Sequence, residues 1–181
     1  MARTMRITSI ITLIVLAVVA ITPVWLLYPP RPTVDTADAV LVIAGASDGR
    51  HEKGTQLIQE GVSDNYVVSN PGGAGDGVGY AHCHGEDRPA SAEDIWCMSP
   101  VPSSTAGEAL TVSGLAESEG WSSLVAVTGR THARRVQTML NRCTNLDAVV
   151  VPMGIRYREL IPSQIAREIG GYIKFWLTNP C

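Results

Sequence analysis

Short apolar runs separated by longer mixed segments are the dominant pattern of this chain beyond residue 30. The runs are rich in Val, Ile, Leu and Ala and lie at residues 39–44, 66–69, 124–128 and 148–151. Apolar runs of this length are typical of strands that are buried on both faces, as in the centre of a parallel sheet. We therefore expect four or five strands in a mainly parallel sheet.

The segments between these runs are predicted to be helical. They are residues 50–60, residues 105–120, the segment after residue 131, and a last helix with Ile161, Ile165, Ile169, Tyr172 or Ile173, and Trp176 at amphipathic spacing. We expect Phe175 and Trp176 to pack in the core or at an interface. Strands that alternate with helices predict a single three-layer α/β domain.

Residues 7–28 form an apolar segment of a different kind. They carry no charge and are long enough to cross the hydrocarbon core of a bilayer. Arg3 and Arg6 precede them, and the positive-inside rule then leaves the rest of the chain outside the cell. A cleaved signal peptide is the alternative, but the apolar run continues to Leu27, which favours an uncleaved anchor. The predicted organisation is a cytoplasmic end at 1–6, a transmembrane anchor at 7–28, a linker at 29–37 and an extracytoplasmic domain at 38–181.

All four cysteines lie beyond the predicted anchor, where an oxidising environment favours disulfides. Three pairings are possible. We predict that neighbours pair, Cys83 with Cys97 and Cys143 with Cys181, because each pair closes a modest loop. Residues 70–104 are rich in Gly, Pro, Asp and Ser, and we expect an irregular insertion framed by the first disulfide.

A metal site and a nucleotide cofactor receive no support from the sequence. Residues 82–87 contain His, Cys, Glu and Asp, but their alternating spacing matches no zinc pattern. The loop 45–50 contains glycines but fits neither the dinucleotide fingerprint nor the P-loop. We therefore predict no metal and no cofactor.

The charge of the chain argues against a nucleic-acid partner. The formal net charge is −3, and the part beyond residue 30 loses two arginines and no acidic residue, which brings its charge to −5. A nucleic-acid-binding domain would instead present a basic face.

The most informative stretch is the strand at 124–128 and the residues that follow it. Thr131 can cap the next helix, and His132 and Arg135 lie three residues apart on one face of it. A helix amino terminus attracts anions through its free N–H groups and its dipole. The stretch therefore predicts an anion site, with a capped surface helix that carries incidental basic residues as the alternative.

In an open parallel sheet, ligands bind outside the carboxyl ends of the strands. This rule gathers Arg50, Ser69 and Thr128 with the helix start at 105–108. Structural roles are the alternatives. Arg50 can pair with Asp48 or Glu52, Thr105 and Glu108 have capping-box spacing, and the two strand-end hydroxyls can simply close their strands.

The order of these motifs carries a resemblance. A strand with a Gly loop and Arg50 is followed by Ser69 and a Gly pair, by Thr105-x-x-Glu108, and by Thr128-x-x-x-His132-x-x-Arg135. The chain from 38 to 181 resembles the YdcF/SanA/ElyC-like family, and most closely its actinobacterial, four-cysteine branch. The resemblance implies a Rossmann-like fold, a membrane-anchored α/β domain, and a role in cell-envelope biogenesis with carrier-lipid or peptidoglycan metabolism as a setting. The matching positions implied as site residues are Arg50, Ser69, Thr105, Glu108, Thr128, His132 and Arg135.

Two function classes follow from these expectations. In the first, Arg50 and Arg135 clamp a phosphate-bearing envelope intermediate, such as a polyprenyl carrier lipid. Ser69, Thr105 and Thr128 also contact it, and His132 acts as general acid or base with Glu108 as its partner. In the second, a non-catalytic module uses the same pocket to sense the anion. The expected partners are the membrane and an anionic small molecule or lipid head group.

Overall fold

The computed structural model describes residues 2–45, 48–155 and 158–181, so Ala46 and Ser47 of the predicted loop 45–50 lie outside the described residues. The helices are α1 (Ala2–Leu27), α2 (Arg50–Gln59), α3 (Gly77–His84), α4 (Thr105–Glu119), α5 (Ala133–Cys143) and α6 (Ile161–Thr178). The strands are β1 (Ala39–Val42), β2 (Asn65–Ser69), β3 (Asp94–Met98), β4 (Ser123–Thr128) and β5 (Asp147–Pro152). Short 3-10 turns lie at Gly73–Gly75, Arg130–His132 and Arg158–Leu160.

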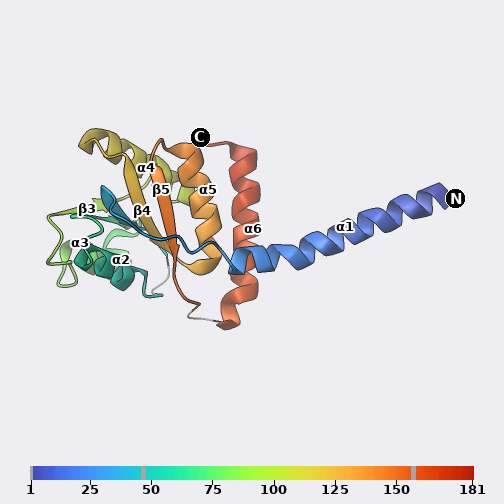
Figure 1. Cartoon of the computed structure of the whole chain (residues 1–181), viewed down its shortest axis with the longest axis horizontal. Helices are drawn as coiled ribbons and strands as arrows, with labels where there is room; N and C mark the ends of the chain where they lie inside the picture. Colours follow the sequence, from blue (N-terminus) through green and yellow to red (C-terminus); the bar gives the residue numbers. More distant parts are fainter. Residues whose placement is uncertain (1, 46–47, 156–157) are drawn as a thin grey trace.

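The five strands form one parallel sheet in the order β3-β2-β1-β4-β5. The two edge strands, β3 and β5, are labelled in Figure 1. Val42 at the end of β1 is paired with Val68 of β2 and Val127 of β4. β1 is buried along its whole length, because helices cover both faces of the sheet. The sequence prediction of a Rossmann-like, mainly parallel α/β domain is confirmed.

The two faces of the sheet have separate apolar cores. On one face, Val40, Val42 and Val68 pack against Leu57 and Ile58 of α2. On the other face, the core is formed by side chains of the sheet and of α4, α5 and α6, namely Leu41, Val67, Ala126, Ala109, Val112, Val136, Leu140 and Phe175. The domain is therefore three-layered, with α2 and α3 opposite α4, α5 and α6.

The stretch 70–104, which we predicted to be an irregular insertion, contains α3 and the edge strand β3. The prediction was wrong for two reasons. α3 contains Gly77 and Gly79, and its start is set by the Asp76 side chain, which accepts a hydrogen bond from the Gly79 N–H at 3.3 Å. β3 is an edge strand with exposed Asp94 and Cys97, so it lacks the apolar run that marks a central strand.

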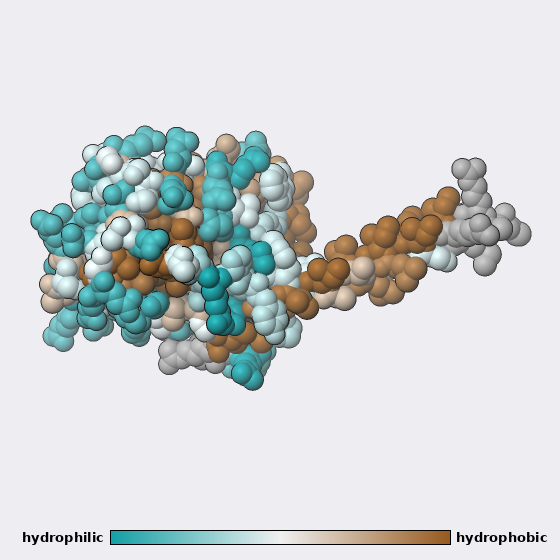
Figure 2. Space-filling model, viewed as in Figure 1, coloured by the Kyte–Doolittle hydropathy of each residue, from teal (hydrophilic) through white to brown (hydrophobic). Residues whose placement is uncertain are grey.

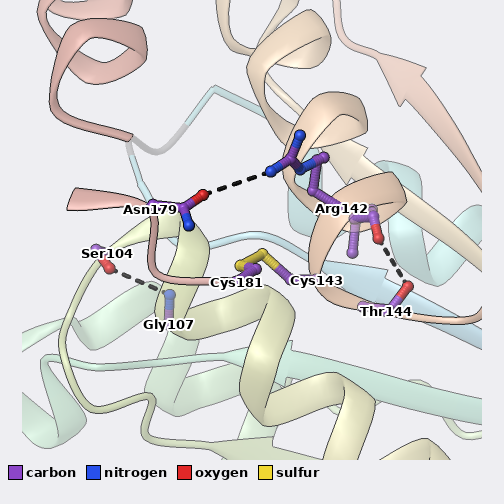
Figure 3. The surroundings of a disulfide bond; sticks show 8 residues. Ser104, Gly107, Arg142, Cys143, Thr144, Asn179 and Cys181 are labelled. Carbon is purple, nitrogen blue, oxygen red and sulfur yellow. Dashed lines mark hydrogen bonds between the residues drawn. A yellow bond between two sulfur atoms is a disulfide. The ribbon is translucent and has the colours of Figure 1, made fainter. Parts of the chain in front are cut away.

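Both predicted disulfides are present. Cys83–Cys97 joins α3 to β3 with a Cα–Cα distance of 5.7 Å, and Cys143–Cys181 joins the end of α5 to the end of the chain at 5.0 Å (Figure 3). The described residues contain one group with the spacing of a metal site, Cys83, His84 and Cys97. Its two sulfur atoms are joined to each other, so they are not free thiolate ligands.

α1 extends away from the domain as a single long helix (Figure 1). Residues Ile7–Leu27 have a mean hydropathy of 2.8 and are almost wholly exposed, so this helix is long and apolar enough to span a membrane. At its base, Arg134 of α5 donates hydrogen bonds to the carbonyls of Trp25 at 2.6 Å and Tyr28 at 3.0 Å. Its guanidinium carbon also lies 4.4 Å from the centre of a ring of Trp25.

α6 packs against α5 and the turn Arg130–His132 with a face that the sequence did not predict. The buried residues of this helix are Glu168 and Phe175. Most of the expected amphipathic stripe is turned outward instead, and the exposed fractions of Ile169, Ile173 and Trp176 are 41%, 55% and 54%. Of the two expected placements, Phe175 has the core one, whereas the exposed Trp176 is not in the core and only an interface remains open for it.

Candidate functional site

A pocket of about 260 Å³ opens at the carboxyl edge of the sheet, next to the ends of β1 and β4. The chain runs outward from β1 to β2 and β3 and then returns to build β4 and β5, so this edge is the topological switch point. Loops after β1, β4 and β5 and one face of α6 line the pocket. The lining includes Gly45, Asp48, Arg50, Gly129, Arg130, Thr131, His132, Arg135, Gly154, Ile155, Gln164, Arg167 and Glu168.

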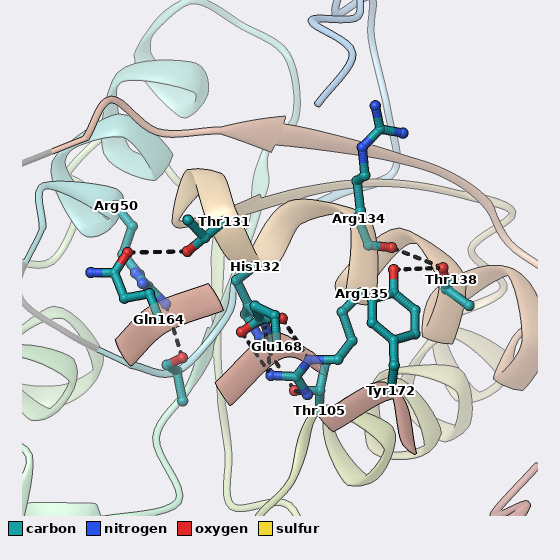
Figure 4. A network of polar contacts seen from close by, with 11 residues as sticks. Arg50, Thr105, Thr131, His132, Arg134, Arg135, Thr138, Gln164, Glu168 and Tyr172 are labelled. Carbon is teal, nitrogen blue, oxygen red and sulfur yellow. Dashed lines mark hydrogen bonds and ion pairs between the residues drawn. The ribbon is translucent and has the colours of Figure 1, made fainter. Parts of the chain in front are cut away.

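An ion network between α5 and α6 forms one wall of the pocket (Figure 4). Arg135 donates from Nε to Glu168 Oε2 at 2.7 Å and from Nη2 to Oε1 at 3.1 Å, which is a bidentate pair. His132 Nδ1 lies 3.1 Å and 3.0 Å from the same two oxygens. Burial by itself would raise the pKa of Glu168, but the hydrogen bonds and charges of His132 and Arg135 outweigh it and lower the pKa to about 2.

His132 links this network to a hydroxyl on α4. Its Nε2 lies 3.2 Å from Thr105 Oγ1, and Arg135 Nη1 donates to the same oxygen at 3.1 Å. Arg135 Nη2 also lies 3.0 Å from Nδ1, but it donates to Glu168 Oε1. Because both oxygens of this carboxylate face Nδ1, we assign the ring proton to Nδ1, and the Thr105 hydroxyl then donates to Nε2. The result is a continuous carboxylate–imidazole–hydroxyl chain from Glu168 through His132 to Thr105.

Arg50 forms the second ion pair of the pocket. Its Nε and Nη2 donate to the two carboxylate oxygens of Asp48, each at 2.8 Å, and its Nη1 donates to the carbonyls of Ile43 and Ala44 at 3.0 and 2.9 Å. The guanidinium lies against Gly45, where an added Cβ would come within 2.6 Å of Nη1. The alternative that Arg50 pairs with Asp48 is therefore what the structure shows.

Two further arginines line the pocket without a carboxylate. Arg130 donates from Nε to the Met153 carbonyl at 3.3 Å, and Arg167 is exposed on α6. Within the described ranges, neither of them forms an ion pair. Among the described residues, the lining of the pocket thus includes four guanidinium groups and two carboxylates, and both carboxylates are already engaged by Arg50 and Arg135.

Three of the expected site residues form a buried polar cluster that does not line the pocket. The Glu108 carboxylate accepts a hydrogen bond from the Ala44 N–H at 2.8 Å, and burial raises the pKa of this side chain. Ser69 and Thr128 are completely buried at the ends of β2 and β4. The Ser69 hydroxyl faces the Glu108 carboxylate and opposes the effect of burial on its pKa, whereas the Thr128 hydroxyl has no hydrogen-bond partner among the described residues. Glu108 thus holds the backbone where β1 ends.

The structure corrects several roles that the sequence suggested. The carboxylate that contacts His132 belongs to Glu168 and not to Glu108. The α4 cap is Ser104, whose Oγ accepts from the Gly107 N–H at 3.1 Å, so the capping box does not start at Thr105 (Figure 3). Thr131 does not cap α5, because His132 occupies the cap position and the Thr131 hydroxyl donates to Gln164 at 3.2 Å.

The expected convergence is nevertheless observed for the three basic residues. Arg50, His132 and Arg135 all line one pocket, whereas Ser69, Thr105, Glu108 and Thr128 lie outside its lining. The sequence analysis missed Glu168, Gln164 and Arg167 of α6. Their only sequence signal is a polar face on a helix that also has a complete apolar stripe.

Comparisons of this chain with family models, with curated proteins and with solved structures found no match.

Proposed function

We propose that this protein is a membrane-anchored component of cell-envelope biogenesis that binds a phosphate-bearing ligand in the pocket between β1 and β4. The charge of the pocket carries the proposal. Asp48 and Glu168 neutralise Arg50 and Arg135, and within the part of the chain that the structure describes Arg130 and Arg167 line the pocket without an ion-pair partner. Guanidinium groups are well suited to phosphate oxygens because their donors form a planar fork.

The paired arginines have a different role in this proposal from the one expected from the sequence. Both guanidinium forks are occupied by carboxylates, so Arg50 and Arg135 shape the walls of the pocket. Arg130 and Arg167 make the charge-assisted contacts to the ligand. Loss of one partner from a buried ion pair leaves an uncompensated buried charge, which strongly destabilises the protein. A ligand therefore does not readily displace Asp48 or Glu168 from its arginine.

The placement of the domain outside the cell is part of the same proposal. Arg3 and Arg6 precede the apolar helix, which favours a cytoplasmic amino terminus. The disulfides Cys83–Cys97 and Cys143–Cys181 favour an oxidising compartment for the domain. The resemblance to YdcF/SanA/ElyC-like proteins supports a polyprenyl carrier lipid, or a related envelope intermediate, as the source of the phosphate.

A second candidate function is catalysis, which the Glu168–His132–Thr105 chain favours. A carboxylate on Nδ1 fixes the ring and supports a positive charge on it, so Nε2 can take a proton from a hydroxyl. The hydroxyl of Thr105, at 3.2 Å from Nε2, does not line the pocket, so it orients His132, which does line it. In a sensing module, the same chain would only hold α4, α5 and α6 together.

Binding is tested with the full chain in lipid nanodiscs and with a polyprenyl phosphate and its pyrophosphate as probes. We expect Arg167→Gln and Arg130→Gln each to weaken binding about tenfold or more, because each removes a charge-assisted hydrogen bond. Arg88→Gln is the matched control, since Arg88 is exposed and does not line the pocket. Equal losses in all three variants, or no binding by the unaltered protein, would reject the proposed ligand class.

Catalysis and sensing are separated by turnover. If the protein is an enzyme, it releases phosphate from one of these probes. Thr105→Val then lowers release, because His132 loses the hydroxyl that orients its ring, while Thr105→Ser retains most of it. Binding should change little in either variant, because Thr105 lies outside the lining of the pocket. Binding without release by the unaltered protein would favour the sensing module.

A further inference from the structure

The outward face of α6 is apolar along most of the helix. Ile169, Ile173, Trp176 and Leu177 have exposed fractions of 41%, 55%, 54% and 81%. Their spacing of four, three and one residues puts them on one side of the helix. Large apolar side chains gathered in this way on a folded domain indicate a surface that contacts another apolar phase.

The polar residues of α6 are arranged around this stripe. Glu168 is buried and faces the domain, and Arg167 and Lys174 are exposed along one flank. A helix with an apolar face, an aromatic residue and basic residues at its flank has the composition of helices that lie in the interface of a bilayer. Trp176 also packs against Arg142, whose guanidinium carbon is 5.0 Å from the centre of a ring.

The position of α6 relative to α1 identifies the apolar phase. α6 lies across the base of α1, and Trp25 of α1 is in ring contact with Tyr172 of α6 at 6.0 Å (Figure 1). In Figure 2, apolar surface is visible on the side of the domain from which α1 extends. A bilayer spanned by residues 7–27 of α1 would therefore meet the outward face of α6.

We infer that α6 lies in the interface of the same bilayer that α1 spans, with Ile169, Ile173, Trp176 and Leu177 inserted below the head groups. Trp25, Tyr172 and Trp176 then lie at one level, where aromatic side chains with a polar atom are favoured. The basic flank of α6 faces anionic head groups.

This orientation also defines where a ligand enters, and that consequence rests on the proposed function. Arg167 belongs both to the basic flank of α6 and to the lining of the pocket, together with Gln164 and Glu168 of the same helix. The mouth of the pocket is therefore at the height of lipid head groups. A phosphate carried by a membrane lipid reaches it without leaving the bilayer.

The contact is tested with the full chain in nanodiscs of anionic lipids, with and without bromine atoms on the acyl chains. Bromine quenches only tryptophans that enter the bilayer. The Trp25→Phe protein is compared with the Trp25→Phe/Trp176→Phe protein, so that the tryptophan of the anchor does not contribute. We expect bromolipid to quench the first protein by about the share of fluorescence that Trp176 contributes, and to leave the second almost unchanged. Equal fractional quenching in the two proteins would overturn the inference.

A second variant tests the stripe itself. In the Trp25→Phe background, Ile173→Asp/Leu177→Asp should abolish the quenching of Trp176 and raise its accessibility to acrylamide in the water phase. The Trp96–Trp121 pair, whose ring centres are 6.1 Å apart on the far side of the domain, provides a near-ultraviolet signal that confirms folding. Quenching that persists in a folded double variant contradicts the inference. None of these measurements requires a ligand in the pocket, so their failure is distinct from a failure of the proposed function.

Discussion

Two histidines on opposite faces of the sheet are held in contrasting ways. His132 contacts Glu168 through Nδ1 and Thr105 through Nε2, so both ring nitrogens have partners. His51 of α2 is 4% exposed and stacks on His82 of α3 with ring centres 4.7 Å apart. The Nδ1 atoms of His51 and His82 have no partner among the described residues.

The two sites are expected to respond differently to acid. Burial, followed by the charges of His82 and Arg50, lowers the pKa of His51 from 6.5 to about 4. Glu168 has a pKa of about 2, so the network around His132 keeps its carboxylate charged over the same range. Both side chains are buried, but only Glu168 has charged partners. We therefore expect the interactions of Glu168 to persist in mild acid, whereas the unpaired His51 makes the folded state less stable there.

The largest effect is expected at the paired site. Glu168→Gln leaves Arg135 as a largely buried cation without its carboxylate, and breaking such a pair costs about 3–5 kcal/mol of the free energy of unfolding. Urea unfolding at neutral pH measures it. Glu117→Gln, on the exposed surface of α4, is the control and should change the free energy little. If both variants unfold at the same urea concentration, the network is not a stabilising element.

A second prediction concerns the two disulfides, one on each face of the sheet. Cys143→Ala/Cys181→Ala should lower the free energy of unfolding by about 4 kcal/mol, and Cys83→Ala/Cys97→Ala by about 3 kcal/mol. The order follows from the sequence separations of 38 and 14 residues. Removing the disulfide that closes the longer loop gives the unfolded chain more conformational entropy, which favours unfolding more. Thermal unfolding under non-reducing conditions compares them. The reverse order would mean that the His51 side of the domain depends more on its disulfide.

The third prediction tests the unpaired site. The unfolded chain binds a proton at His51 near pH 6.5, whereas the folded chain resists until about pH 4, so stability falls as pH falls through this window. Between about pH 7 and pH 5, the loss due to His51 is about 2 kcal/mol. His51→Gln should remove this part of the pH dependence, and His84→Gln, at an exposed position, should keep it. Denaturant unfolding at pH 7 and pH 5 gives the change in the free energy of unfolding for the unaltered protein and for the two variants. The same change in all three proteins would refute the assignment to His51.

The smallest effect is expected from two neighbouring glycines of α6. An added Cβ at Gly171 would lie 2.7 Å from Arg135 Cζ, whereas the same atom at Gly170 meets nothing within 4 Å. Gly171→Ala should therefore destabilise by about 1–2 kcal/mol through displacement of the guanidinium. Gly170→Ala should stabilise by up to about 1 kcal/mol, because alanine favours a helix. Thermal unfolding compares the two variants. A shift of both unfolding temperatures in the same direction would contradict the close packing of Arg135 against Gly171.

The sequence was informative where one physical rule dominates. β1, β2, β4 and β5 are apolar runs because parallel strands in this sheet are covered on both faces, and their carboxyl ends gather Arg50, His132 and Arg135 into one pocket. β3 was missed because an edge strand needs no such run.

The partners of the site residues were harder to predict. Arg135 and Glu168 are 33 residues apart, and no pattern in a single sequence sets the register of α5 against α6. α6 also reverses the usual assignment of faces, since a charged Glu168 is turned inward and Ile173 outward. The ordinary rule for amphipathic helices places the apolar stripe of α6 in the core and its polar residues in solvent. Under that rule, Glu168 is predicted to be exposed and is not recognised as a site residue.

Arg134 has a consequence for how the protein searches for a ligand. Its hydrogen bonds to the carbonyls of Trp25 and Tyr28 fix the end of α1 to α5 in rotation as well as in position. These contacts favour one orientation of the domain relative to α1. In the proposed membrane setting, encounters with a ligand then occur by lateral diffusion of the whole molecule in two dimensions, and a longer linker at residues 29–37 would not extend the reach of the pocket while this attachment persists.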